Sequence, residues 1–222
     1  MDYFVFGLGD PPHPACTKFG GAPYRSRSIA WPKTGNGGNC EFIAQINFSQ
    51  SRDLSSRLPS DLLLIFLTSE DGASTADYYF EWGQTEIADP ILVSDLPELP
   101  FGAIQNLAFC EIHRTMEYLT NGYAKNDPII DYGNLVVSKI GGISNYSGGR
   151  APSLSGFHLF TLSTIWTSKG RPFPFLNQEQ PIPKPDEPGM GDYMFTILML
   201  GDIGEAYFFL EGDKINVETR SF

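Results

Sequence analysis

A five-residue motif occurs twice in this sequence, and the repeat limits what the chain can fold into. Thr-Lys-Phe-Gly-Gly at 17–21 returns as Ser-Lys-Ile-Gly-Gly at 138–142, 121 positions later. Each copy has a hydroxyl residue, a lysine, a bulky apolar residue and two glycines. A unit repeated at this scale usually packs against its copy. The repeat therefore predicts a single domain over residues 1–222, built from two related halves at about 1–120 and 135–222.

Composition and patterning favour β-structure. The chain has 23 Gly and 17 Pro, which divide it into short elements, and Phe and Tyr dominate its aromatic residues. Alternation of polar and apolar residues, and unbroken apolar runs, predict the strands. We expect strands at 42–48, 62–67, 78–82, 110–118, 157–166, 193–200 and 206–210. The pair 193–200 and 206–210 would mirror the pair 42–48 and 62–67. The expected fold is mainly β, an internally duplicated β-roll-like domain with few short helices.

Charge and cysteine content limit the classes of partner. The net charge is −11, from 26 acidic and 15 basic residues. Such a surface repels phosphate backbones and attracts basic proteins, so we expect no nucleic-acid partner. Three widely spaced cysteines and three scattered histidines indicate neither a disulfide framework nor a zinc site, and we expect no cofactor. With no secretion signal and no membrane-spanning apolar run, we expect a cytoplasmic protein without a membrane partner.

Four segments together resemble the YwqG-like family of bacterial proteins, a family whose function is undefined. The segments are Lys-Phe-Gly-Gly-Ala-Pro-Tyr at 18–24 with Trp31-Pro32, the strand at 42–48, the second motif at 139–142, and the stretch at 201–210 that begins Gly-Asp-Ile-Gly. Their order and spacing cover nearly the whole chain. One departure is Leu200, where the family often has Trp. The resemblance implies a bacterial protein with a mainly β, roll-like fold, and it implies no catalytic residue.

The candidate binding residues lie in and beside the repeats. Backbone N–H groups of the glycine pairs, with a lysine charge, would suit an anionic ligand, although a tight turn or bulge is the simpler interpretation. Asp202 with Glu205 would supply carboxylates, although Asp between glycines is typical of a turn. Aromatic residues beside loops would bind a protein partner. The candidates are Lys18, Gly20, Gly21, Tyr24, Trp31, Lys139, Gly141, Gly142, Asp202 and Glu205.

Binding is a better interpretation than catalysis, because no nucleophile with an adjacent base stands out. We expect an immunity protein that neutralises a basic toxin, since charge complementarity speeds the capture of a cationic partner. The alternatives are a hydrolase-type enzyme and a small-ligand sensor, each using a cleft between the two halves. Strongly perturbed titratable groups in a deep pocket would favour the enzyme, and an apolar pocket would favour the sensor. An acidic face with exposed aromatic residues would favour the binding protein.

Overall fold

The computed structural model shows a mainly β protein, which confirms the predicted fold class. It describes residues 2–8, 11–51, 54, 58–69, 75–104, 107–114, 138–142, 154–163, 166–168, 193–196, 198 and 204–221. Asp202 and the acidic stretch 186–192 lie outside these residues. The described helices are two short 3-10 turns, η1 (Thr75–Asp77) and η2 (Val93–Asp95). Neither is long and apolar enough to cross a membrane.

One antiparallel sheet, almost closed into a barrel, contains most of the described strands. Its order is β12-β11-β8-β7-β1-β6-β2-β3-β4-β5. Its strands are β1 (Asp2–Leu8), β2 (Lys18–Phe19), β3 (Glu41–Asn47), β4 (Leu62–Leu67), β5 (Tyr78–Gly83), β6 (Ala108–Arg114), β7 (Lys139–Ile140), β8 (Phe157–Ser163), β11 (Gly204–Glu211) and β12 (Lys214–Ser221). β9 (Trp166–Ser168) and β10 (Tyr193–Thr196) pair separately.

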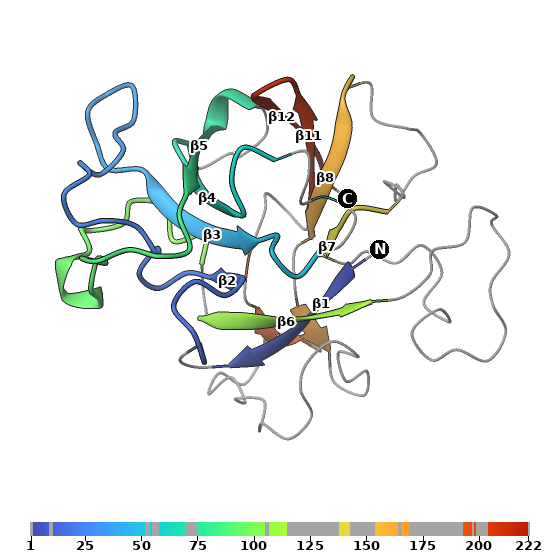
Figure 1. Cartoon of the computed structure of the whole chain (residues 1–222), viewed down its shortest axis with the longest axis horizontal. Helices are drawn as coiled ribbons and strands as arrows, with labels where there is room; N and C mark the ends of the chain where they lie inside the picture. Colours follow the sequence, from blue (N-terminus) through green and yellow to red (C-terminus); the bar gives the residue numbers. More distant parts are fainter. Residues whose placement is uncertain are drawn as a thin grey trace, which may run out of the picture.

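The sheet order shows the internal duplication directly. β2-β3-β4-β5 of the first half and β7-β8-β11-β12 of the second run outward from a central antiparallel pair, β1 and β6. β1 precedes the first half in sequence but pairs with β7, while β6 precedes the second half but pairs with β2. In Figure 1 the β1–β6 pair crosses the lower part of the view, with β2 to β5 above it toward the upper left. The two halves have therefore exchanged their first strands.

The repeated motif makes the same hydrogen bonds in both halves. The Thr17 hydroxyl accepts a bond from the Asn47 N–H at 3.0 Å, and the Ser138 hydroxyl accepts one from the Ser163 N–H at 3.1 Å. Three positions after each hydroxyl residue stands a glycine at positive φ. The N–H group of this glycine donates to the backbone carbonyl of a β-bulge residue. Gly20 donates to Ile43 at 3.0 Å and Gly141 donates to Leu159 at 2.7 Å. Each motif thus holds a bulge at the equivalent place in its half.

The hydrophobic core lies on the inner face of the sheet and draws on both halves. Phe160 of β8 stacks on Phe208 of β11 with ring centroids 4.2 Å apart. The ring centroid of Phe48, which follows β3, lies 6.0 Å from that of Phe160. The ring centroid of Tyr78 of β5 lies 5.6 Å from that of Phe208. These aromatic contacts join first-half and second-half strands across the barrel interior.

A threonine side chain helps to close the barrel between its two edge strands. The Val217 N–H in β12 donates to the Thr75 hydroxyl oxygen at 2.8 Å, and that hydroxyl donates to the Val217 carbonyl at 3.2 Å. Thr75 lies in η1, directly before β5. A side chain therefore satisfies backbone groups of β12 that a neighbouring strand would otherwise pair.

Two expectations about the strands were wrong. A strand at 193–200 was expected to form with 206–210 the pair that mirrors 42–48 and 62–67. Instead, β8 pairs with β11 as β3 pairs with β4. The strand expected at 157–166 ends at Ser163. The central strand β1 was not predicted, since its seven residues show little alternation. Of the strand expected at 110–118, the described part ends at Arg114.

Replacing Gly20 or Gly141 by Ala should destabilise the protein by about 1–3 kcal/mol, because both have positive φ, 68° and 62°. Gly20→Ala should cost more, since an added Cβ would lie 2.6 Å from Ile104 Cγ2, whereas nothing lies within 4 Å at Gly141. Gly35→Ala is the control, with open space and no positive φ. Urea unfolding checks this, and equal midpoints for Gly141→Ala and Gly35→Ala would contradict it.

Candidate functional site

The lysine–glycine motifs lie within the sheet. Lys18 and Lys139 both point to the outer face, because the residues that follow them, Phe19 and Ile140, belong to the inner core. Both lysines are nevertheless buried. The Gly20 and Gly141 N–H groups donate to the bulge carbonyls, so these two groups have an internal acceptor. This arrangement fits the turn interpretation of the glycine pairs better than an anion site.

The aromatic candidates Tyr24 and Trp31 pack over the outer face of the first half. Tyr24 is buried, and its hydroxyl accepts a hydrogen bond from the Ile87 N–H at 3.2 Å. Trp31 is half-buried, and its indole N–H donates to the Cys40 carbonyl at 2.8 Å. Both belong to an outer cluster with Phe42, Leu62, Leu64 and Phe66, among others. These aromatic rings therefore hold the segment before β3 onto the sheet.

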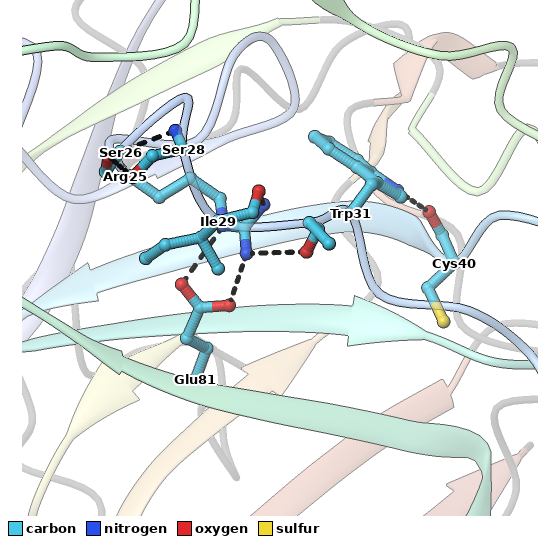
Figure 2. Close-up of polar contacts among 8 residues, drawn as sticks. Arg25, Ser26, Ser28, Ile29, Trp31, Cys40 and Glu81 are labelled. Carbon is cyan, nitrogen blue, oxygen red and sulfur yellow. Dashed lines mark hydrogen bonds and ion pairs between the residues drawn. The ribbon is translucent and has the colours of Figure 1, made fainter.

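An ion pair between the buried Arg25 and the partly buried Glu81 ties the same segment to β5. The Arg25 guanidinium donates twice to Glu81, from Nε at 3.0 Å and from Nη2 at 2.8 Å (Figure 2). Its remaining N–H groups donate to the Ile29 and Ala30 carbonyls, each at 3.2 Å. The ring of Trp31 lies 5.9 Å from the guanidinium carbon. Such a two-pronged pair fixes direction as well as distance. Sequence reasoning missed it, because its partners are 56 residues apart.

The ion pair positions two surface segments, 26–29 and 86–99, side by side. The Arg27 N–H donates to the Asp89 carbonyl at 2.8 Å, and the Ile91 N–H donates to the Arg25 carbonyl at 3.0 Å. Ser26 adds a hydroxyl bond to Asp89 Oδ1 at 2.8 Å. These bonds give the two segments a fixed relative geometry, although neither segment contains a regular strand.

The surface formed by 26–29 and 86–99, called here the acidic rim, exposes apolar side chains between carboxylates. Val93, Leu92 and Ile29 are 71%, 52% and 48% exposed. The exposed acids there are Glu86, Asp89, Asp95 and Glu98. Clustered exposed aliphatic residues with a polar border are typical of protein interaction sites. The run Ile-Leu-Val at 91–93, between acids and prolines, was the sequence signal for this surface.

The outer face of the second half has a different character. Tyr207 donates a short hydrogen bond from its hydroxyl to the Glu205 carboxylate, and the Ser163 hydroxyl donates to the same carboxylate at 3.4 Å. His158 Nε2 and the Thr161 hydroxyl form a bond at 3.0 Å. All of these except His158 are at most 2% exposed. The structure thus places the candidate Glu205 in a buried polar cluster, on the same face as Lys139.

The register shows what stands at the matching positions in the first half. His158, Glu205 and Tyr207 correspond to Phe42, Leu62 and Leu64, because each occupies the same ladder position relative to its motif and bulge. At these three positions the outer face is therefore apolar in the first half and polar in the second. Sequence alone gives no sign of this, since it depends on pairing β8 with β11.

His158 is the most perturbed titratable group of the polar face. Burial, assisted by the positive charge of Lys139, lowers its pKa to about 4, against smaller raising effects of the Gly142 and Phe160 backbones. The imidazole is therefore neutral at pH 7. Across the part of the chain that the structure describes, no three His, Cys, Asp or Glu side chains gather as metal ligands.

Part of the chain matches a known protein family. Residues 17–125 match the model of a family described as a domain of unknown function, DUF1963. The matched region runs from the first motif to beyond β6, and so it includes Arg25, Glu81 and the acidic rim. The second half lies outside the match. No curated protein matches the sequence.

Replacing Glu81 by Gln should destabilise the protein by about 3–5 kcal/mol, because it leaves the Arg25 guanidinium buried without a counter-charge. The matched control is Glu218→Gln. Glu218 corresponds to Glu81 in the second half, but it pairs with Arg220 where both side chains are partly exposed, so its loss should cost about 1 kcal/mol or less. Thermal and urea unfolding measure both. Equal losses for the two variants would show that Arg25–Glu81 has no special role.

The stability of the protein should fall as the pH drops from about 6.5 to 4, in part through His158. The unfolded chain binds this proton at the ordinary pKa of 6.5, whereas the folded protein binds it only near 4. The stabilisation is therefore complete above pH 6.5 and is lost on acidification, by about 3 kcal/mol. Urea unfolding at several pH values should show a shallower pH slope for His158→Phe. Equal slopes for the His158→Phe variant and the parent protein would contradict the assignment.

Proposed function

We propose that this protein acts by binding a basic protein partner through the acidic rim, as an immunity-type neutraliser of a cationic toxin domain. The observation that carries the proposal is the exposure of Ile29, Leu92 and Val93 among carboxylates on one surface. An aliphatic centre supplies the desolvated contact of an interface, and the surrounding charges select the partner.

The charge of the acidic rim supports a cationic partner. Residues 84–100 contain four acids and no Lys or Arg. Two exposed cations lie near these four acids. Arg27 bonds Asp95 at 3.1 Å, and Lys33 bonds Asn39, whose amide donates to the Glu98 carbonyl. The local charge is therefore negative, as is that of the whole chain. Opposite charge on a partner raises the rate of encounter, and the effect weakens as salt screens it.

The anchoring of the acidic rim supports binding without large rearrangement. Arg25 and Glu81 hold 26–30 against β5, and backbone bonds join 25–27 to 89–91. A surface that is fixed before association loses less conformational freedom on binding. This is the advantage that an inhibitor of a toxin needs, because it must bind quickly and dissociate slowly.

We also propose that the chain is a YwqG-like protein of the bacterial cytoplasm. The matched family model covers two of the segments that carry this resemblance, 18–32 and 42–48. A cytoplasmic position would suit a protein that protects its own cell from a basic toxin.

Charge reversal on the acidic rim should slow association with the partner more than the same reversal elsewhere. Glu86 and Glu98 are exposed and bond no side chain in the described structure, so Glu86→Lys with Glu98→Lys changes the charge locally. Glu111→Lys with Asp213→Lys changes the net charge equally at other exposed positions. The partner, captured from native cytoplasm, would be tested by stopped flow at two salt concentrations. We expect the association rate of the parent protein to fall steeply as salt rises, and only the acidic-rim variant to lose this dependence. Equal effects of the two double variants, or recovery of small molecules alone, would overturn the proposal.

A further inference from the structure

Lys18 is a buried lysine for which the described structure offers no counter-charge. It is 8% exposed. No hydrogen bond or ion pair of its ammonium group is found with any described residue. Lysine is rarely buried unless it is paired, because an isolated ammonium group is costly to remove from water. The side chain therefore needs an explanation beyond packing.

Of the two ladder neighbours of Lys18, one is apolar and the side-chain amide of the other is already hydrogen-bonded. These neighbours are Gln45 of β3 and Phe109 of β6. The Gln45 side chain accepts from the Tyr24 N–H at 2.8 Å and donates to the Pro14 and Cys16 carbonyls at 2.8 and 2.7 Å. The amide is thus committed to holding the segment before β2. Phe109 contributes only a ring.

Desolvation changes the chemistry of the amine. Burial lowers the pKa of Lys18, and the nearby Cys16 thiol opposes this only in part. A larger fraction of the side chain is therefore present as the neutral amine, whose nitrogen lone pair is free to react. Desolvated lysines of this kind are the ones that form Schiff bases with carbonyl compounds.

We propose that Lys18 is a nucleophilic amine that forms an imine with a small aldehyde or ketone at the outer face of β2. The nitrogen lone pair attacks the carbonyl carbon, and the carbonyl electron pair moves to oxygen to give a carbinolamine. The carbinolamine loses water, formed from the carbonyl oxygen and the two hydrogens of the amine, as the C=N bond forms. No oxidant, reductant or metal is required. The low exposure of Lys18 restricts the reaction to small carbonyl compounds.

The test is reductive trapping on the intact chain. The protein is incubated with acetaldehyde and cyanoborohydride at pH 7, and modification of each lysine is followed by peptide mass mapping over time. Lys33 and Lys214 are exposed and serve as internal controls. We expect Lys18 to be modified at least twice as fast as either control, and its rate to rise less than theirs between pH 7 and pH 9.

Two outcomes of the trapping experiment would overturn the proposal. If Lys18 stays unmodified, or reacts no faster than Lys33 and Lys214 at pH 7, the proposal is wrong. The comparison uses the wild-type protein alone, so it does not depend on a variant that folds. Lys18→Arg adds a check where it folds, because the fast-reacting peptide should then disappear while the control lysines react as before. Binding through the acidic rim is a separate property, and either result leaves it unaffected.

Discussion

The pairing of β1 with β6 is the contact on which the rest of the structure depends. Seven residues of each strand face each other in unbroken antiparallel register. On its other side, β1 pairs with β7 of the second half, and β6 pairs with β2 of the first half. Each strand therefore joins the half that it does not directly precede in sequence. Removing either strand would therefore expose an edge in both halves. This exchange makes the two halves mutually dependent, and the shared aromatic core strengthens that dependence.

A common framework with two different outer faces explains the division of roles along the chain. The hydroxyl and glycine bonds of the motif are the same in both halves, so they belong to the framework. In the first half the outer face carries an apolar cluster that is covered by the segment that Arg25 secures, which leaves the acidic rim at the surface. In the second half the same face carries Glu205 and Tyr207. The two halves thus share one pattern of strand pairing while carrying different side chains on this face.

The parts of this structure that sequence predicted are those set by local pattern. Alternation and apolar runs located β3 and β4, and the repeated motif identified the duplication, because both signals lie within a few residues. Pairing partners were not accessible in the same way. The strand opposite β11 was misassigned, and Arg25 and Glu81 meet only because β5 folds back beside the segment before β3. Burial of Tyr24 and Trp31 likewise depends on that packing, so the aromatic candidates could not be sorted into core and surface.

Native-state hydrogen exchange tests most directly whether the exchanged strands make one cooperative unit. The informative amides are those of Gly20 and Asn47 in the first half and of Gly141 and Ser163 in the second, which make matching bonds. All four amides should exchange only through global unfolding, with the same free energy and the same dependence on denaturant. If the second-half amides exchange through a smaller opening while the first-half amides stay protected, the halves unfold independently, which would contradict their mutual dependence through β1 and β6.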